Sequence, residues 1–189
     1  MVLAGGRSRR MGGVDKMTLV VDGRPILAAA CDAVASARRL VVVGPAGVAG
    51  TPERAVAVRE DPPFAGPAAA IGAGLAALGD DVAAIVVVLA ADVPRAAEAV
   101  PALLVHAAGS DADGVVARSS DGRRQPLLAV YRSASLRAAL EEHVPLTDLG
   151  VGQVTRSLHL DELDLPDDVL ADIDSPADLA RLTEETSRG

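Results

Sequence analysis

The sequence has almost no aromatic side chains and only one cysteine. Its 189 residues include one Tyr, one Phe and no Trp. Proteins that bind single-stranded nucleic acid stack bases on aromatic rings, so this composition disfavours a nucleic-acid partner. The single Cys31 excludes an intramolecular disulfide and a cysteine-rich zinc site. A single cysteine is typical of proteins in a reducing compartment, and we therefore expect this protein to be cytoplasmic.

Long apolar runs are missing as well. No stretch approaches the roughly 18 uninterrupted apolar residues of a membrane-spanning helix, and the first residues lack the layout of a signal peptide. We therefore expect no membrane partner. Half of the residues are nevertheless hydrophobic, mostly Ala, Val and Leu. This predicts a single globular domain over residues 1–189 with a core of small aliphatic side chains.

The net charge of −8 is unevenly distributed. Residues 161–185 hold ten acidic residues and one basic residue, and the rest of the chain is nearly neutral. Charges in so acidic a segment are often simply solvated. Basic side chains gather near the start of the chain, at Arg7, Arg9, Arg10, Lys16 and Arg24. Such a cluster suits a small polyanion such as a triphosphate, although a solvated surface loop has the same pattern.

Strand-like apolar runs alternate with Ala- and Leu-rich helical stretches, which is typical of an α/β domain with a mainly parallel sheet. We expect strands at 1–3, 40–43, 55–58, 83–90, 114–117 and 127–131, and helices at 26–37, 67–78, 96–107, 134–142 and 176–184. Residues 144–166 have weak periodicity. The first strand is short, and a start codon annotated too late, a trimmed chain and a truly short strand explain it equally well.

Asp92 directly follows the run 84–90, which is apolar on both faces and therefore belongs at the centre of the sheet. Ligands of open α/β sheets bind beyond the carboxyl ends of the strands, so this carboxylate is a candidate site residue. The alternative is an ordinary helix N-cap, because Asp-x-Pro often starts a helix.

A glycine-rich stretch follows the first strand and reads LAGGRSRRMGGVDK over residues 3–16. It lacks the spacing of two common phosphate loops, G-x-x-x-x-G-K-[ST] and G-x-G-x-x-G. Glycines nevertheless let backbone N–H groups approach a phosphate chain, and Arg10 and Lys16 can neutralise its oxygens. A Gly-rich turn after a strand is also often only a turn.

The same stretch resembles the opening signature L-A-G-G-x-S-x-R-M-G-x-x-D-K of the molybdenum cofactor guanylyltransferase family. Four further segments resemble motifs of that family in the same order: Glu60-Asp61-Pro62 with GPAAAIGAGL at 66–75, AADVP at 90–94, RQPL at 124–127 and DSPADL at 174–179. The resemblance extends over most of the chain, and five ordered motifs make coincidence an unsatisfactory explanation.

The resemblance implies a three-layer α/β/α, Rossmann-like nucleotidyltransferase fold. It also implies an Mg²⁺-dependent enzyme that transfers GMP from GTP to the terminal phosphate of molybdopterin and releases pyrophosphate. GTP and molybdopterin would be its partners, with other molybdenum cofactor biosynthesis proteins as further candidates. Attack by the acceptor phosphate needs no protein nucleophile, so the protein has to position two polyanions and offset developing charge.

The resemblance also assigns residues to the site. The catalytic set is Lys16, Arg10 and Asp92. The nucleotide-binding set is Leu3, Ala4, Gly5, Gly6, Lys16, Asp61 and Asp92. Asp61 would accept hydrogen bonds from guanine N1–H and N2–H₂, and Asp92 would bind Mg²⁺. Asp172 and Asp174 flank Ile173 and point to one face of an extended segment, so either is a candidate second ligand, and Asp174 is our choice.

Two positions depart from the family pattern. Gly44 stands where members often carry Asn, and the sequence near residue 148 lacks the family's basic turn, so Arg156 or Arg123-Arg124 would have to meet the acceptor phosphate. A CTP-dependent or other-acceptor nucleotidyltransferase of the same fold is the close alternative, although L-A-G-G favours the guanylyl branch over the L-A-A-G of the cytidylyl branch. A catalytically inactive nucleotide-binding module is a further alternative.

Other chemically versatile side chains lack a partner at ligand spacing, which assigns them to packing or to the surface: Cys31, His106, His143 and His159. Gly72 and Gly74 interrupt a predicted helix although glycine is a poor helix former. This indicates backbone that is crowded against a neighbour or a ligand.

Overall fold

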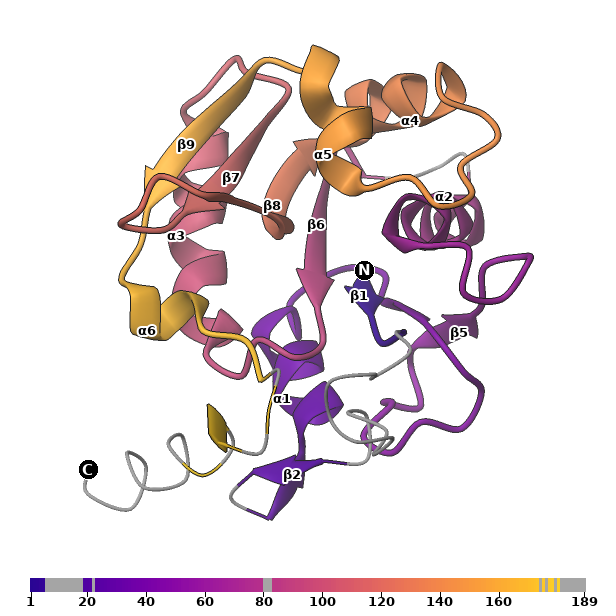
Figure 1. Ribbon diagram of the computed structural model, residues 1–189, viewed down its shortest axis with the longest axis vertical. Helices are drawn as coiled ribbons and strands as arrows, with labels where there is room; N and C mark the ends of the chain where they lie inside the picture. The colour runs from indigo at the N-terminus through magenta and orange to yellow at the C-terminus, as the bar shows by residue number, and fades with distance from the viewer. Residues whose placement is uncertain are drawn as a thin grey trace.

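A computed structural model of the protein, which describes residues 1–5, 19–21, 23–79, 83–173, 175, 177–178 and 180, has a seven-stranded sheet between two layers of helices (Figure 1). The strand order is β5-β4-β1-β6-β8-β7-β9. The strands are β1 (Val2–Leu3), β4 (Val41–Val43), β5 (Val56–Val58), β6 (Ile85–Ala90), β7 (Gly114–Arg118), β8 (Arg124–Arg132) and β9 (Leu160–Asp164). Only β8 runs against its neighbours. The predicted α/β class and mainly parallel sheet are therefore confirmed.

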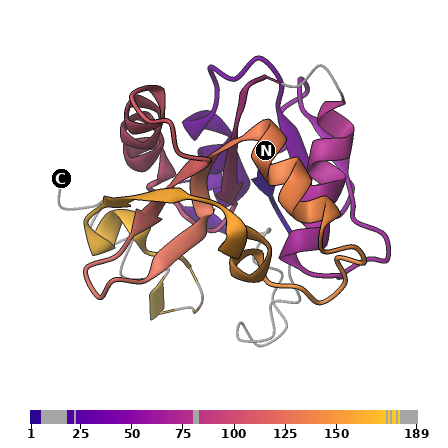
Figure 2. The same cartoon turned by 90° about the horizontal axis from the view of Figure 1, so that it is seen from above.

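The helices divide between the two faces of the sheet, as the view from above shows (Figure 2). One face carries α1 (Ile26–Ala33), α3 (Ala96–Ala108) and α6 (Asp167–Leu170). The other carries α2 (Pro67–Leu78), α4 (Ser133–Glu141), α5 (Val151–Val154) and a 3₁₀-helix (Thr155–Ser157). A separate hairpin pairs β2 (Val20–Val21) with β3 (Arg24–Pro25). Across the described ranges, no helix is both long and apolar enough to cross a membrane.

Side chains of the central strands enter two cores in alternation, because successive residues of a strand point to opposite faces. On β4, Val42 packs with the α1–α3 layer, and Val41 and Val43 pack with the α2–α4 layer. On β6, Leu89 packs with the α1–α3 layer and Val88 packs with the α2–α4 layer. Burial on both faces explains why these strands read as unbroken apolar runs.

Small residues let the layers approach closely. A Cβ on Gly74 of α2 would lie 2.7 Å from the sulfur of Met1, and one on Gly72 would lie 2.9 Å from Leu146 Cδ1. Real Cβ atoms do not approach other atoms this closely, so the ends of the Met1 and Leu146 side chains would have to shift. The expectation that these two glycines mark crowded backbone is confirmed, and the neighbours are other parts of the protein itself.

Some elements differ from the sequence-based expectations. Strand β9 lies in the stretch 144–166, for which no strand was predicted, because its acidic residues do not resemble a buried strand. These acids are also not simply solvated: the Arg118 guanidinium donates to Glu162 at 2.6 Å and to Asp164 at 2.9 Å. The helix α1 ends at Ala33, four residues earlier than predicted, and most of the helix predicted at 176–184 lies outside the described residues.

Candidate functional site

The carboxyl ends of β1, β4, β5 and β6 meet at one edge of the sheet. Strands β4 and β6 lie on opposite sides of β1 and run parallel to it, so the direction of strand addition reverses beside β1. Such a switch point is where open α/β sheets bind their ligands. The residues that follow these strands are Ala4 and Gly5, Gly44, Glu60 and Asp61, and Asp92. The structure therefore brings three of the family-like motifs to one edge.

The chain after β1 is fixed by backbone hydrogen bonds up to Ala4. The N–H of Ala4 donates to Val43 O at 2.7 Å, and Leu3 O accepts from Ala91 N at 2.9 Å. Leu3 and Ala4 are buried, whereas Gly5 is exposed. Among the described residues, none has a heavy atom within 4 Å of a Cβ built on Gly5. Gly5 is thus the first residue beyond the sheet with open space beside its backbone.

Gly44, the position that departs from the family pattern, lies directly against Ala4. A Cβ at position 44 would be 2.7 Å from the carbonyl oxygen of Ala4 and 2.9 Å from its carbonyl carbon. The N–H of Gly44 also donates to Val58 O at 2.8 Å, which holds its backbone in place. In this chain a side chain at position 44 would have to displace Ala4, which is a steric reason for glycine there.

Asp92 follows β6 and is partly buried at the same edge. Helix α3 begins at Ala96, and its N-cap residue is Arg95. The alternative that Asp92 caps this helix is therefore wrong. The carbonyl of Asp92 accepts a hydrogen bond from Ile173 N at 3.0 Å, and Ile173 is buried. This bond returns the segment that contains Asp172 to the end of β6.

A divalent metal is compatible with the donors at this edge. Mg²⁺ is commonly held by one or two carboxylates together with phosphate oxygens of a substrate. Asp92 and Asp172 are carboxylates on two segments that a backbone hydrogen bond joins. The described residues form no group of three or more His, Cys, Asp or Glu side chains that would hold a metal by itself.

The loop after β5 presents Asp61 and is held from within by Glu60. Asp61 is exposed, whereas Glu60 is only 8% exposed and its Oε1 accepts from Phe64 N at 2.9 Å. The Arg59 guanidinium lies 4.7 Å from the centroid of the Phe64 ring, which is itself 43% exposed. No role was expected for Glu60 or Phe64 from the sequence. The signals available were the place of Glu60 in the family-like segment Glu60-Asp61-Pro62 and the position of the only Phe, three residues after Asp61.

The turn near residue 148 packs on this loop. The N–H of Asp148 donates to Ala65 O at 2.7 Å, and Leu149 O accepts from Ala68 N in the first turn of α2 at 3.4 Å. Asp148 adopts φ of 59°, a left-handed conformation that Asp tolerates better than most residues. Asp148, near which the family's basic turn was expected, thus lies beside the loop that carries Asp61.

The arginines considered for the acceptor phosphate lie at different ends of the sheet. Strand β8 begins at Arg124, and its residue Leu128 pairs with Leu89 near the carboxyl end of β6. Arg123 and Arg124 therefore extend past the edge that carries Asp92. Arg156 precedes β9, which is parallel to β7, and so lies toward the amino ends.

Arg124 is also engaged in an ion pair. Its Nε donates to Glu162 Oε1 at 2.7 Å, and this hydrogen bond is the main reason that the pKa of Glu162 is lowered. Arg123, in contrast, is exposed at the tip of the β7–β8 hairpin, where its backbone N–H donates to Asp121.

Four predicted site residues lie outside the described part of the chain: Gly6, Arg10, Lys16 and Asp174. Their roles remain predictions. The packing assignment of Cys31 agrees with its environment, since burial raises the pKa of this thiol to about 11 and keeps it protonated at neutral pH. His106 contacts Asp161 at 3.2 Å, and His143 contacts Ala139 O at 2.8 Å.

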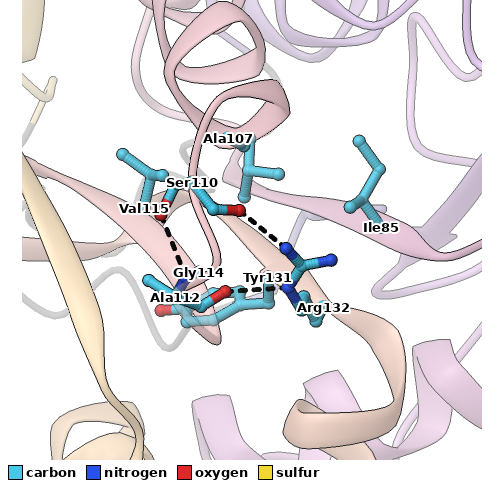
Figure 3. Close-up of a pocket in the computed structure, with 9 residues that line it drawn as sticks. Ile85, Ala107, Ser110, Ala112, Gly114, Val115, Tyr131 and Arg132 are labelled. Carbon is cyan, nitrogen blue, oxygen red and sulfur yellow. Dashed lines mark hydrogen bonds between the residues drawn. The ribbon is translucent and has the colours of Figure 1, made fainter.

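Two cavities in the described regions lie at the opposite edge of the sheet. The smaller, about 10 Å³, lies where the Arg132 guanidinium donates to the carbonyls of Ser110 and Ala112 (Figure 3). It has room for about one water molecule. The larger, about 280 Å³, is mainly apolar and is lined by the ends of α1 and α2, the start of β6 and part of α3. Neither is near Asp61 or Asp92.

The fold is that of solved nucleotidyltransferases. More specifically, residues 1–162 match the MobA-like NTP transferase domain, and the chain belongs to this family. No curated protein sequence shows a significant match to the chain.

Three solved structures illustrate the similarity of the fold. Molybdopterin-guanine dinucleotide biosynthesis protein A from Archaeoglobus fulgidus is 20% identical, with a TM-score of 0.73 over 100% of this chain and 98% of that one. Rv0371c from Mycobacterium tuberculosis, in complex with manganese, is 20% identical, with a TM-score of 0.70 over 97% and 96%. The 2-C-methyl-D-erythritol 4-phosphate cytidylyltransferase from Thermus thermophilus is 19% identical, with a TM-score of 0.69 over 98% of each chain.

Proposed function

We propose that this protein transfers GMP from GTP to the terminal phosphate of molybdopterin and releases pyrophosphate, with Mg²⁺ as its metal. The observation that supports this most strongly is the meeting of Gly5, Asp61 and Asp92 at one switch point of the sheet. These residues come from three separate family-like motifs, and each has a different task in nucleotidyl transfer. The cytoplasm is the setting that we propose, on the basis of the single, buried cysteine.

Each task follows from the chemistry of the residue. Gly5 leaves room for a triphosphate to pass close to the backbone. The exposed carboxylate of Asp61 would accept from N1–H and N2–H₂ of guanine, a pair of donors that adenine does not present in this arrangement. Asp92, with Asp172 or Asp174, would hold the metal against the phosphates. Bound Mg²⁺ supplies positive charge that offsets the charge developing on the phosphoryl oxygens.

Lys16 and Arg10 complete the proposed site. Both are cationic residues of the glycine-rich loop, and we assign them to the phosphates, with Lys16 stabilising charge in the transition state. The attacking group is an oxygen of the acceptor phosphate, so the protein acts by alignment and charge compensation and forms no covalent intermediate.

The acceptor phosphate would be met by the β7–β8 hairpin. Arg123 and Arg124 are on the Asp92 side of the sheet, whereas Arg156 is toward the opposite end. Arg123 is exposed, and Arg124 shares Glu162 with Arg118. We therefore favour Arg123 as the first contact of the acceptor phosphate and Arg124 as a residue that supports the hairpin.

A CTP-dependent transferase remains the second candidate, because a cytidylyltransferase has nearly the same fold over 98% of this chain. A thermal-shift panel with Mg²⁺ and GTP, CTP, ATP or UTP separates the two. A ligand at 100 times its Kd stabilises a protein by about 2.7 kcal/mol. At about 2–4 °C per kcal/mol, this raises Tm by about 5–10 °C. We expect that shift with GTP alone, and a shift with CTP instead would establish the alternative.

A further inference from the structure

Glu60 is an acidic residue in an unusual place. Among the residues that the structure describes, it is the only buried acid, and the only other buried polar residues are Ser133 and Thr155. Those two hydroxyls bond to nearby carbonyls, Ala83 O at 2.6 Å and Val151 O at 3.0 Å. Burying an acidic group is costly, and an apolar residue would fill the same space at lower cost. The position of Glu60 therefore requires an explanation beyond packing.

The hydrogen bond of Glu60 closes the loop that carries Asp61. Oε1 accepts from Phe64 N, four residues later, at 2.9 Å. One residue further along, Ala65 N donates to Pro62 O at 3.2 Å, so the loop turns back on itself. The Arg59 guanidinium lies over the Phe64 ring, 4.7 Å from its centroid. Asp61 is thus the exposed acid of a loop that is tied on both sides of it.

We propose that Glu60 is a positioning residue for base selection: through the Phe64 N–H it fixes the loop so that Asp61 is held ready to accept from the base of a purine nucleotide with a 2-amino group. This inference rests on the proposed function, because it takes Asp61 as the residue that binds guanine. A loop fixed before binding avoids the entropic cost of ordering it at the moment of binding. Loss of the Glu60 bond would therefore weaken selection of the base and leave the chemical step unchanged.

The test compares GTP with inosine triphosphate, which lacks the 2-amino group. Calorimetric Kd values with Mg²⁺ are measured for the wild type, Glu60→Ala and Glu60→Gln, together with kcat and KM for pyrophosphate release. Glu60→Gln keeps an acceptor oxygen and should retain the wild-type preference for GTP. Glu60→Ala should weaken GTP binding about tenfold, equivalent to about 1.4 kcal/mol. Inosine keeps N1–H, so inosine triphosphate binding should weaken less than GTP binding, and kcat should stay within about twofold of the wild type.

A double-mutant cycle separates positioning from general stability. In an Asp61→Asn background, Glu60→Ala should cause no further change in the ratio of the two Kd values. If Glu60→Ala does not fold, Glu60→Asp, which is one methylene shorter, provides the same comparison. An equal loss for both nucleotides, or an unchanged preference for GTP in the Ala and Asp variants, would overturn the role of Glu60. A wild type that binds both nucleotides equally would instead overturn the proposed base contact of Asp61.

Discussion

The two glycines beside Ala4 should respond to substitution in opposite ways. At Gly44, a Cβ would lie 2.7 Å from Ala4 O. Neither atom belongs to a flexible side chain, so the backbone has to shift. Overpacking of this kind typically costs about 1–3 kcal/mol. For a chain of this length, a cost of about 2 kcal/mol corresponds to a fall in Tm of about 4–8 °C.

At Gly5, a Cβ meets no heavy atom of the part of the chain that the structure describes within 4 Å, and the residue is exposed. Gly5→Ala should therefore leave Tm within about 2 °C of the wild type, since surface substitutions usually change stability by less than about 0.5 kcal/mol. The added methyl group would occupy the space that we assign to the triphosphate. Displacing a reacting group by about 1 Å can cost about 100-fold in rate.

The assay measures Tm by calorimetry and pyrophosphate release with GTP for both alanine variants. We expect Gly44→Ala to lose stability and Gly5→Ala to lose about 100-fold in turnover at unchanged stability. Wild-type turnover in Gly5→Ala would refute the path of the triphosphate along Gly5. Wild-type Tm in Gly44→Ala would refute the steric account of Gly44.

Three further predictions concern the metal, the acceptor and pH. Asp92→Asn should abolish Mg²⁺-dependent pyrophosphate release with Tm unchanged, and retained turnover would contradict the metal assignment. Arg123→Gln should raise KM for the acceptor about tenfold, while the control Arg156→Gln should have no effect. Equal effects of the two substitutions would show that the β7–β8 hairpin does not bind the acceptor phosphate. Ion pairs with arginines lower the pKa of Glu162 and Asp164. A carboxyl group whose pKa is lowered in the folded protein adds stability, and this stability is lost as the pH falls below the ordinary pKa of the group. Below about pH 4.5, the free energy of unfolding should therefore fall less steeply with pH in Glu162→Gln than in the wild type.

The fold was largely predictable because its central strands are buried on both faces. The apolar runs in β4 and β6 identify such strands directly. Strand β9 was missed because it is an edge strand whose acids pair with Arg118 and Arg124, and local sequence does not reveal partners that are distant in the chain. The acidic side chains of residues 161–185 were expected to be solvated for the same reason, because local sequence does not reveal distant arginine partners.

The candidate site was predictable where a motif names the residue. Asp61 and Asp92 were identified in this way, and the structure places both at one edge of the sheet. Glu60 stands in the same motif as Asp61 but received no role, because its burial and its bond to Phe64 N are properties of the folded loop. The contact between Gly44 and Ala4 joins two strands and could likewise not be read from either segment alone.

Guanylyl transfer to molybdopterin can be followed directly with a labelled nucleotide. The wild-type protein is incubated with Mg²⁺, molybdopterin and a nucleoside triphosphate labelled at the α-phosphate, and the label and pyrophosphate are followed together. We expect label from GTP to enter a dinucleotide product in a 1:1 ratio with pyrophosphate, and we expect CTP to give neither. Transfer from CTP in place of GTP, or no transfer from any nucleotide, would contradict it.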